Sequence, residues 1–562
     1  MNAWNFACPD WEQRLRAGKS LIPDLPLDSG EAARAVGIFD KLRLPDVPDQ
    51  PPMAQAAGDW QRDIVRAIFG SLIDGRRMVP SVFCMVPKKN SKTTGGAAIT
   101  LTGFLMNARP RAEFVYVGPT QEVADLAFQQ TVGMIEADEY LSTRFHIAHH
   151  TKTIQDRRNK ARLKVKTFDM KVVTGSKPAF VLLDELHLMA TINGAARVVG
   201  QIRGGLLPNP EGVLIMITTQ SDEPPAGVFK AELQYARGIR DGRIKSGKVL
   251  PILYEFPEEM QRGAAWREPE NWPMVLPNLG RSIHLDRLID DYEAAREKGD
   301  EEERRWASQH LNVEIGVALH SDRWLGADYW LGAEDKSITL DSLIADSDCI
   351  VFGIDGGGLD DLFGLAAIGR HKTSKVWRLW THAWAHPDVL SRRLEIADRL
   401  HDFVADGDLT ICDDPTQDFR EVAALIARVR DTGLLPDKAG VGLDPVGVTA
   451  MIDELAAHGI AGDQVVAVSQ GFRLTDAVHG MERKLKDGTL LHAGSPLMAW
   501  CVGNAKIEQR GNAVIITKQA SGKAKIDPLV AAFDAGKLMS NNPEASGAGM
   551  DDYFRSLSGV AA

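Results

Sequence analysis

Val82-Phe-Cys-Met-Val-Pro-Lys-Lys-Asn-Ser-Lys-Thr-Thr94 and, further along the chain, Phe180-Val-Leu-Leu-Asp-Glu-Leu-His187 are the most informative stretches of this sequence. Each starts with a short, continuous apolar run, which is typical of a strand buried on both faces of a parallel sheet. The first run leads into a lysine-rich loop and then into Gly95-Gly-Ala-Ala, which favours the start of a helix. The second run ends in two carboxylates. We therefore predict two neighbouring buried strands that carry polar groups at their carboxyl ends.

The loop after the first strand has the chemistry of a phosphate-binding loop. Backbone amides of such a loop face the phosphates, a lysine reaches the β- and γ-phosphate oxygens, and a hydroxyl residue holds Mg²⁺. Lys92 and Thr93 occupy these two positions, although the two glycines of the usual signature are absent. The alternative interpretation is a basic surface loop. The predicted ATP-binding residues of the loop are Lys88, Lys89, Asn90, Ser91, Lys92, Thr93 and Thr94.

The acidic pair after the second strand supplies the partner of this loop. A carboxylate at that position can hold the Mg²⁺ of a bound nucleotide, and its neighbour can orient the attacking water. Asp184 is the predicted metal ligand and Glu185 the predicted catalytic base. A solvated acidic turn is the alternative for this motif taken singly, and the presence of both motifs in the right order favours the nucleotide site.

Two weaker signals belong to the same prediction. A third apolar run, 213–217, leads into Thr218 and Thr219, whose hydroxyl groups could sense the γ-phosphate and relay its loss to a neighbouring element. A strand end capped by hydroxyl groups is an equally good interpretation of that pair. Gln61 lies at the start of the helix predicted from Asp59, where its side-chain amide could hydrogen-bond adenine.

The second half of the sequence predicts a different acidic site. Strands are expected at 350–354, 365–368 and 376–380, with the spacing of an antiparallel meander, followed by alternating helices and strands. Asp355 and Asp444 each follow a predicted strand, and Asp527 lies in the first turn of a predicted helix. If they converge, three carboxylates can hold two Mg²⁺ or Mn²⁺ ions for phosphodiester cleavage. The fold would then be RNase H-like, whereas Asp at a strand end or helix cap needs no function at all.

Composition limits the remaining possibilities. The 562 residues carry 65 basic and 76 acidic side chains, a net charge of −11, so contact with nucleic acid is expected to be local. No stretch reaches the roughly 20 apolar residues of a membrane-spanning helix, and the N-terminus lacks the pattern of a signal peptide. The five cysteines are scattered and form no CxxC motif, which argues against a disulfide framework or a zinc ribbon and favours a reducing cytoplasm.

The order of these motifs resembles the large subunit of the terminases of tailed bacteriophages, in particular the HK97-like group, over residues 59–536. Residues 87–93 resemble that group's degenerate Walker A motif, 175–187 its Walker B motif, and Thr218-Thr219 its coupling motif. Ser91 departs from the usual glycine, and Gly356-Gly-Gly358 replaces a hydroxyl residue often found after the first nuclease Asp. Further landmarks are Trp272, Pro277-Asn-Leu-Gly280, His310-Leu-Asn312, Leu491-His-Ala-Gly-Ser-Pro496, Trp500, Gly503-Asn-Ala505, Lys518 and Lys525-Ile-Asp527.

The resemblance implies an α/β fold in which a P-loop NTPase, with a mostly parallel sheet and helices on both faces, precedes an RNase H-like nuclease. We expect an N-terminal arm at 1–50, the ATPase motor at 51–339, the nuclease at 340–545 and a flexible tail at 546–562. Asp355, Asp444 and Asp527 would then be the metal-binding carboxylates of the nuclease. A DEAH-type helicase or remodelling ATPase without nuclease activity, suggested by Asp184-Glu-Leu-His187, is the alternative.

The same resemblance implies the protein's partners. It implies ATP-driven translocation of double-stranded DNA into a procapsid and metal-dependent cutting of the DNA concatemer. ATP with Mg²⁺ and two Mg²⁺ or Mn²⁺ ions are the expected cofactors. Expected partners are the portal of the procapsid, a small terminase subunit and further copies in a ring, pentameric by resemblance, with no membrane involved. The expected location is the host cell cytoplasm, transiently at the portal, and not as a stable part of the virion.

Overall fold

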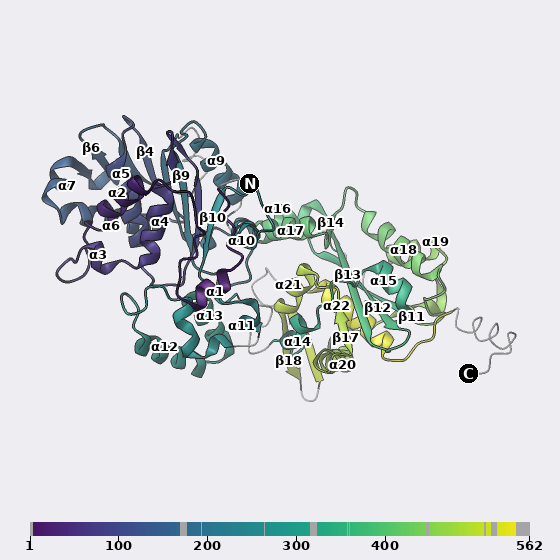
Figure 1. The fold of residues 1–562 in the computed structure, drawn as a ribbon. Coiled ribbons are helices and arrows are strands. Elements are labelled where there is room, and N and C mark those ends of the chain that lie inside the picture. The colour runs from purple at the N-terminus through teal and green to yellow at the C-terminus, as the bar shows by residue number, and fades with distance from the viewer. Residues whose placement is uncertain are drawn as a thin grey trace. The chain divides into compact units, whose positions relative to one another are not determined.

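The computed structural model of the chain comprises two compact units, Met1–Ile315 and Gly316–Ala562 (Figure 1). The dividing point precedes the boundary expected near residue 340, because Trp324 and Trp330 are fully buried in the core of the second unit. Of the expected C-terminal tail, only Ser546 lies inside the described residues. The structure describes residues 4–168, 177–190, 192, 194–262, 265–314, 323–356, 358, 360–444, 449–510, 513–518 and 525–546.

The first unit is built around an eight-stranded sheet in the order β10-β3-β9-β8-β4-β7-β6-β5. The strands from β10 to β7 pair in parallel, and β6 and β5 extend the sheet as an antiparallel edge. All three apolar runs predicted for this unit are strands of this sheet, as β3, β8 and β9. The strands are β3 (Ser81–Met85), β4 (Glu113–Gly118), β5 (Phe145–Ala148), β6 (Thr153–Asp156), β7 (Arg162–Thr167), β8 (Phe180–Asp184), β9 (Val213–Thr218) and β10 (Val249–Leu253).

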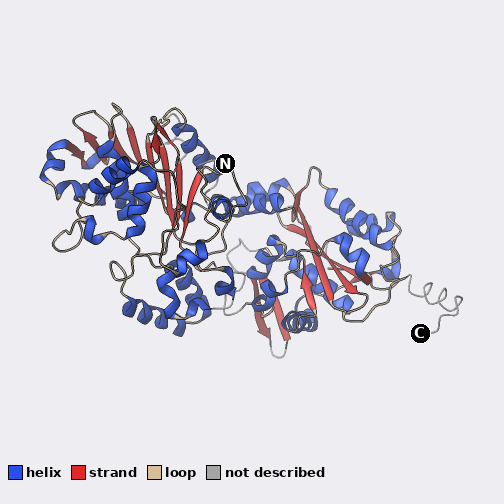
Figure 2. Ribbon diagram, viewed as in Figure 1, coloured by secondary structure: helices blue, strands red, loops and turns tan. Residues whose placement is uncertain are grey.

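Helices cover both faces of this sheet, as the parallel topology requires (Figure 2). Alternate residues of β4 point to opposite faces: Phe114 packs on Phe104 of α5, whereas Val115 lies on the side of Ile202 of α9. The helices are α1 (Trp11–Arg16), α2 (Ser29–Phe39), α3 (Met53–Ala56), α4 (Asp59–Phe69), α5 (Lys92–Met106), α6 (Gln121–Glu136), α7 (Glu139–Arg144), α9 (Ala195–Leu206), α10 (Gly227–Arg240), α11 (Glu258–Arg262), α12 (Leu285–Glu297) and α13 (Asp300–Leu311).

The N-terminal segment is part of the first unit. Phe6, Trp11, Leu15 and Phe39 are buried in the same hydrophobic core as the central sheet. Buried apolar surface of this kind contributes about 1.5 to 3 kcal/mol for each large side chain. The proline-rich sequence that predicts an arm therefore forms a lead-in that packs on the sheet domain.

The second unit contains a seven-stranded mixed sheet in the order β14-β13-β12-β11-β15-β16, with β17 paired to β13. Three long strands, β11 to β13, form the predicted antiparallel meander, and β14, β15 and β16 add parallel pairs at its two sides. A separate hairpin joins β18 and β19. The strands are β11 (Ser347–Gly356), β12 (Leu362–His371), β13 (Trp377–Ala385), β14 (Leu409–Ile411), β15 (Val441–Leu443), β16 (Val465–Ala467), β17 (Leu490–His492), β18 (Ala505–Arg510) and β19 (Ala513–Lys518).

Each face of this sheet has its own core. On one face Val351 belongs to the cluster that contains helix α22; on the other Phe352 belongs to the cluster under α18. The helices are α14 (Ala327–Trp330), α15 (Leu340–Asp346), α16 (Pro387–Arg392), α17 (Leu394–Asp406), α18 (Gln417–Arg430), α19 (Thr449–Ala457), α20 (Thr475–Lys486), α21 (Pro496–Asn504) and α22 (Asp527–Met539).

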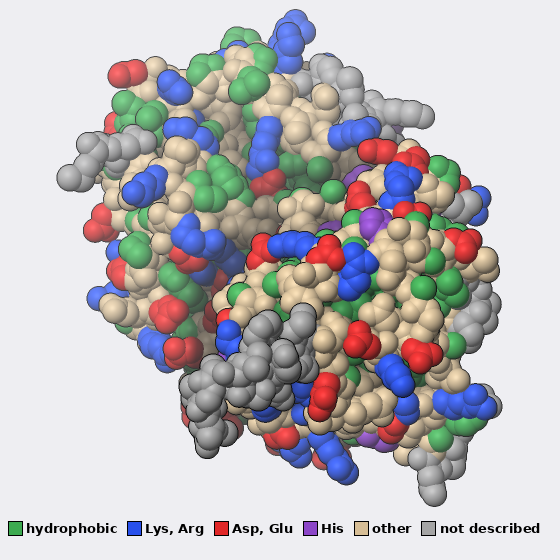
Figure 3. Space-filling view, turned by 90° about the vertical axis from the view of Figure 1, so that its right-hand side faces the viewer, with side chains coloured by type: hydrophobic (Ala, Val, Ile, Leu, Met, Phe, Trp, Pro, Cys, Tyr) green, Lys and Arg blue, Asp and Glu red, His purple; other side chains and the backbone are tan. Residues whose placement is uncertain are grey.

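The surface carries charges of both signs. On the face drawn in Figure 3, Lys and Arg side chains are interspersed with Asp and Glu side chains. This mixture agrees with the modest net charge of −11. Among the described helices, each is too short or too polar to cross a bilayer.

Candidate functional site

Three neighbouring parallel strands bring the predicted nucleotide motifs to one edge of the first sheet. Strand β9 lies between β3 and β8, and its register pairs Thr218 with Met85 on one side and Ile217 with Asp184 on the other. The carboxyl ends of parallel strands meet at the same edge, which is where open α/β sheets bind ligands. The loop after β3, the acidic pair after β8 and the threonines after β9 therefore lie side by side.

Two short contacts join the loop to the acidic pair. Lys92 Nζ lies 2.7 Å from Glu185 Oε1, and Thr93 Oγ1 donates a hydrogen bond of 2.7 Å to Asp184 Oδ2. Lys92 and Thr93 open helix α5, so its N-terminal amides face the same edge. The sequence-predicted pairing of Lys92, Thr93, Asp184 and Glu185 is thus present as side-chain contacts.

The loop adopts its tight conformation without glycine. Lys89 and Ser91 both have positive φ values, 67° and 56°, in the left-handed region that costs a non-glycine residue about 1 kcal/mol or more. Glu185 is held in the same region with φ of 55°. Surrounding contacts must stabilise these conformations, and the buried asparagine of the loop supplies several of them.

Asn90 is fully buried and anchors the loop from inside. Its Nδ2 donates to the Pro87 carbonyl at 3.0 Å, and its Oδ1 accepts from the backbone N–H of Asn278 at 3.0 Å. Ser282 Oγ donates to the Lys89 carbonyl at 2.5 Å. The segment 278–282 therefore holds the loop through hydrogen bonds to Asn90 and Lys89. Sequence analysis identified this segment only as a landmark of the family.

Gln61 lies behind the loop and supports it from the side of α4. Its Nε2 donates to the Ser91 carbonyl at 3.2 Å, and the side chain is only 1% exposed. The loop thus uses the nitrogen of the amide group predicted to bind adenine, whereas Gln61 Oε1 has no hydrogen-bond partner among the described residues. A small cavity under Lys92 is lined by Gln61, Trp60, Cys84 and Ile217, among other residues.

His187 connects the acidic pair to the threonines after β9. Its Nδ1 lies 3.3 Å from Glu185 Oε2 and 3.1 Å from Thr218 Oγ1, and its backbone N–H donates to the same hydroxyl at 3.0 Å. Burial lowers the pKa of the His187 imidazole to about 4, so the ring is neutral near pH 7. Sequence reasoning gave this histidine no role, although its place two residues after Glu185 was the available signal.

The threonines are fixed on their other side as well. Thr218 Oγ1 donates to the Thr219 carbonyl at 2.9 Å, and both residues are fully buried. Next to them the backbone N–H of Gln220 donates to Asn312 Oδ1 at 2.9 Å. Asn312 ends helix α13 in a left-handed conformation, with φ of 53°. Polar contacts thus lead from Glu185 through His187 and the segment 218–220 to Asn312 at the end of α13.

The donor set of this edge fits a magnesium-bound nucleotide. Burial, together with the neighbouring Glu185, raises the pKa of Asp184 to about 7. A divalent cation beside Asp184 would stabilise its carboxylate form, and Thr93 Oγ1 is the second oxygen at that position. Oxygen donors of this kind are the ligands that Mg²⁺ prefers.

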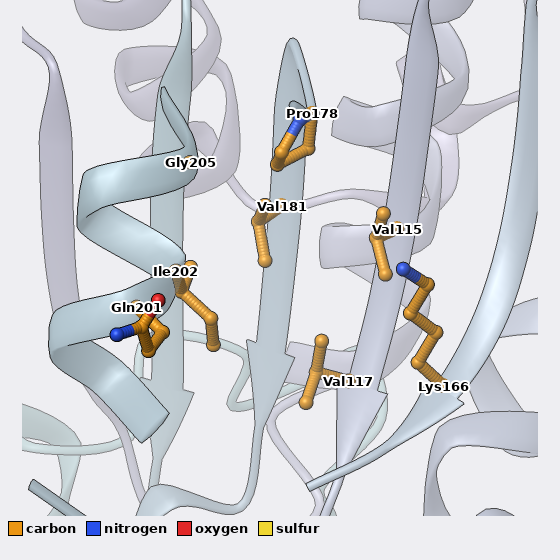
Figure 4. A pocket seen from close by; sticks show the side chains of 8 residues that line it. All are labelled: Val115, Val117, Lys166, Pro178, Val181, Gln201, Ile202 and Gly205. Carbon is orange, nitrogen blue, oxygen red and sulfur yellow. The ribbon is translucent and has the colours of Figure 1, made fainter. Parts of the chain in front are cut away.

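A second hollow of this unit lies away from the phosphate edge. It sits between α9 and the sheet, and Figure 4 shows Ile202 of α9 facing Val181 of β8 and Val115 and Val117 of β4. Its lining is mainly aliphatic, with Lys166 at one side. Packing, rather than nucleotide chemistry, accounts for this hollow.

In the second unit, register places two of the predicted carboxylates beside each other. Strands β11 and β15 run in parallel with Ile354 opposite Leu443, so the residues that follow are Asp355 and Asp444. Neighbouring strands lie about 4.8 Å apart, which brings the two backbones within reach of a shared ligand. Successive side chains of a strand alternate between the two faces of the sheet, so Asp355, four residues after Val351, points to the same face as Val351, which α22 covers.

Asp527 reaches the same place because α22 crosses very close to the sheet. A Cβ atom at Gly353 would lie 1.9 Å from the Ala531 carbonyl oxygen, and one at Gly364 would lie 2.7 Å from Pro528 Cα. Gly364 is the register partner of Asp355 on β12. Glycines at these two positions let the helix place Asp527 directly over the end of β11.

Two further carboxyl groups complete the cluster, and sequence reasoning missed both as site residues. Asp534 lies seven residues after Asp527, on the same face of α22. It is fully buried and accepts a hydrogen bond from Gln470 Nε2 at 3.1 Å. Burial and the charges of Asp355 and Asp444 raise its pKa to about 8. Asp361 lies close enough to Asp527 to raise the pKa of that carboxyl group, and it pairs with Lys525 Nζ at 2.6 Å.

The cluster fits divalent cations. Burial and the nearby Asp361 and Asp355 raise the pKa of Asp527 well above its usual range, which shows how strongly like charges are crowded here. Asp527 Oδ2 is buried without a hydrogen-bond partner among the described residues. Cations bound to such oxygens relieve the repulsion and satisfy the unpaired atom.

Comparison with protein families gives matches along most of the chain. Residues 59–238 match the family model for the ATPase domain of the terminase large subunit. Residues 253–539 match the model for the endonuclease domain of the same subunit. The two models cover both candidate sites, since the loop of Lys92 lies in the first match and Asp355, Asp444 and Asp527 lie in the second.

Individual relatives are more distant. Protein YmfN of Escherichia coli (strain K12) is 21% identical over 365 residues, which cover 64% of this chain and 76% of that protein. The terminase large subunit of Lactococcus phage p2 is 26% identical over 281 residues, 47% of each chain, so the match spans about half of that relative. The crystal structure of the HK97 bacteriophage large terminase covers 90% of this chain and 99% of that one, with 19% identity and a TM-score of 0.45.

Proposed function

Because the chain belongs to the family of terminase large subunits, we propose that the two clusters described above are its two active sites. Members of the family carry an ATPase domain and an endonuclease domain and act in the packaging of phage DNA, and this chain has both domains. The DEAH-type helicase alternative is wrong, because a nuclease domain follows the ATPase where a helicase would carry a second motor domain. The fold is an α/β P-loop ATPase followed by a nuclease domain.

In the ATPase site we assign Lys92 to the β- and γ-phosphate oxygens and Glu185 to the attacking water. Thr93 and Asp184 would hold Mg²⁺, which neutralises charge on the phosphates when it is bound. The observation that carries this assignment is the 2.7 Å hydrogen bond between Thr93 and Asp184, because it joins the two motifs at one point. Lys88, Lys89, Asn90, Ser91 and Thr94 would surround the phosphates, largely through backbone amides.

The threonine pair after β9 would couple hydrolysis to movement. His187 Nδ1 lies 3.3 Å from Glu185 Oε2 and 3.1 Å from Thr218 Oγ1, so a shift of Glu185 on loss of the γ-phosphate would be felt through His187 at Thr218 and Thr219. Gln61 is assigned to adenine through its Oε1, which has no hydrogen-bond partner among the described residues, while its Nε2 supports the loop at Ser91.

In the nuclease site we assign Asp355, Asp444 and Asp527 as ligands of two Mg²⁺ or Mn²⁺ ions. Such a pair activates water and stabilises the leaving oxygen when it is bound to the carboxylates. The protein's part is to hold the carboxyl groups at the sheet edge, and the close approach of α22 over Gly353 supports that role. Asp534 is assigned as a fourth carboxylate of the same site.

The assembly around the chain is also a proposal. Terminase function implies DNA and packaging partners, and we propose double-stranded DNA as substrate, the portal of a procapsid and a small terminase subunit as partners, and a ring of copies, pentameric in number, on the portal. The expected order of a motor followed by a nuclease is retained as a functional proposal; the expected bounds were 51–339 and 340–545, and we place the boundary at the division between the two compact units, with the N-terminal segment counted with the motor. The corresponding location is the host cytoplasm, transiently at the portal.

One assay tests the proposed chemistry of the second site. Supercoiled plasmid is incubated with the full chain in chelator, in Mg²⁺ and in Mn²⁺, each with and without ATP. We expect nicking and linearisation only with a divalent cation, and cutting by the metal-loaded chain when ATP is absent. Cutting that persists in chelator would refute the two-metal assignment.

A further inference from the structure

A second group of metal-ligating side chains lies outside both active sites. His386, Cys412 and Asp418 each offer one ligand atom, and these atoms all lie within 4.8 Å of one another. No sequence motif marks them, because they come from three different elements. His386 follows β13, Cys412 follows β14, and Asp418 lies in the first turn of α18.

Backbone pairing fixes two of these residues beside each other. Ala385 of β13 is the register partner of Ile411 of β14, and the Cys412 N–H donates to the Ala385 carbonyl at 2.9 Å. His386 and Cys412 are therefore adjacent positions at the carboxyl ends of two parallel strands. Such an edge is where α/β sheets place ligand-binding side chains.

The group lies on the opposite face of the sheet from the nuclease carboxylates. Cys412 belongs to the hydrophobic cluster under α18, together with Phe352 and Trp384. Asp355 points to the other face, which α22 covers. Ions at the two places would thus be separated by the sheet itself, and the group is not an extension of the nuclease site.

The distances favour ligation over hydrogen bonding. His386 Nε2 lies 3.6 Å from Asp418 Oδ2, which is too long for a hydrogen bond. Zinc ligands at bond lengths of about 2.0 to 2.3 Å in a tetrahedron are separated by roughly 3.3 to 3.6 Å. The imidazole and the carboxylate already have that separation, and the thiol sulfur lies within 4.8 Å of both ligand atoms.

Two of the three side chains of this group are buried. Cys412 is 1% exposed and Asp418 is 2% exposed, whereas His386 is only partly buried. Asp418 Oδ1 accepts a hydrogen bond from the Phe419 N–H at 2.9 Å, and a metal ion at Oδ2 would further offset the cost of burying this carboxylate. Access from solvent through the histidine side leaves an entry path for an ion.

We propose that His386, Cys412 and Asp418 bind one Zn²⁺ ion, or a similar transition-metal ion, that ties β13, β14 and α18 together. A set of nitrogen, sulfur and oxygen donors suits zinc, whereas Mg²⁺ prefers oxygen donors alone. Three protein ligands leave one position for water. The ion would join the three elements at a place away from the nuclease carboxylates.

Cobalt titration of the full chain tests this proposal directly. Co²⁺ bound to a thiolate gives a charge-transfer band in the near ultraviolet, whereas Co²⁺ on carboxylates alone does not. We expect the wild-type chain to develop this band to one equivalent and to lose it when Zn²⁺ is added. The same Zn²⁺ should raise the melting temperature of the chain.

Matched variants separate the site from the other thiols. Cys412→Ala and His386→Gln should each reduce the band at least tenfold, whereas Cys349→Ala, at a buried cysteine of the same sheet, should leave it unchanged. His386→Gln serves if Cys412→Ala fails to fold, because His386 is the least buried of the three. The absence of a thiolate band in the folded wild-type chain, or an unchanged band in both variants, would overturn the proposal.

Discussion

Lys92 Nζ and Glu185 Oε1 lie 2.7 Å apart, so the residue assigned to the phosphates and the residue assigned to the water form an ion pair with each other. Both side chains are largely buried, at 8% and 18% exposed, so solvent screens the pair only in part. Lysine that turns toward a triphosphate must leave this pair, which frees Glu185 to accept a hydrogen bond from water. With these assignments, ATP binding and activation of the base would be linked through this one contact.

Glu185→Gln should retain ATP binding and lose hydrolysis. The amide cannot act as a base, and it no longer holds Lys92 as an ion pair, so we expect ATP affinity equal to or tighter than that of the wild type. Turnover should fall by about 10² or more, as is typical when a general base is lost. Equilibrium binding of a fluorescent ATP analogue and a phosphate-release assay measure the two effects.

Glu122→Gln is the control, because Glu122 is exposed on α6. Its binding and turnover should match the wild type. Glu185→Gln with wild-type turnover would remove Glu185 from the role of base.

Asn90→Asp should weaken ATP binding at least tenfold. Asn90 donates to the Pro87 carbonyl from a fully buried position, and a carboxylate cannot donate there. The unsatisfied carbonyl costs about 1 to 3 kcal/mol, and the new negative charge repels the phosphates. Asn5→Asp, at an exposed position, should bind ATP normally in the same titration. Equal affinity of both variants would mean that Asn90 does not shape the loop.

Asp534→Asn should slow metal-dependent DNA cleavage by about 10- to 100-fold, the usual cost of losing a residue that supports metal ligands. Higher Mg²⁺ or Mn²⁺ concentrations should restore part of the rate, because the loss acts on metal affinity. Asp453→Asn, on the exposed side of α19, is the control and should cut normally. If the metal-concentration dependence of Asp534→Asn matches that of the wild type, Asp534 lies outside the metal site.

His187→Gln should change how the stability of the first unit depends on pH. Burial lowers the pKa of His187 from 6.5 to about 4 in the folded chain. Between these two values the unfolded chain binds a proton that the folded chain excludes, so the free energy of unfolding falls as pH falls from 6.5 to 4. One group contributes a slope of at most about 1.4 kcal/mol per pH unit.

Denaturant titrations between pH 4 and pH 7 measure this slope. His187→Gln should show a flatter dependence than the wild type, and His146→Gln, at an exposed position, should show the wild-type dependence. Identical slopes for all three proteins would mean that His187 is not held neutral by burial.

The local sequence was sufficient to predict the strands of the first sheet and the loop that follows β3. The runs before Lys92 and before Asp184 are continuous and apolar, which only strands buried on both faces require, and their polar ends follow directly in the chain. Chain order then brings these ends to one edge of a parallel sheet. Asp355, Asp444 and Asp527 were found for the same reason, as acids at the ends of elements.

Contacts between residues far apart in the sequence could not be predicted from these local patterns. Asn278 lies far from Asn90 in sequence, and only the folded chain brings its N–H to the loop. Asp534 resembles any acidic residue of a helix, although its spacing of seven residues from Asp527 places both on one face of α22 and was a usable signal. Prolines near the N-terminus predicted an arm, whereas the burial of Phe6 and Trp11 depends on a core that forms only in three dimensions.

We propose that one chain carries two separate chemistries, ATP hydrolysis at Lys92 and DNA cleavage at Asp355. The most direct measurement is a pair of assays, ATP turnover and plasmid cleavage in Mn²⁺, run on Lys92→Ala, Asp355→Ala and Lys248→Ala as an exposed control. We expect Lys92→Ala to lose ATP turnover and still cut DNA, and Asp355→Ala to stop cutting and still hydrolyse ATP. Lys248→Ala should retain both activities. ATP turnover by Lys92→Ala or cutting by Asp355→Ala at the wild-type rate would contradict this proposal.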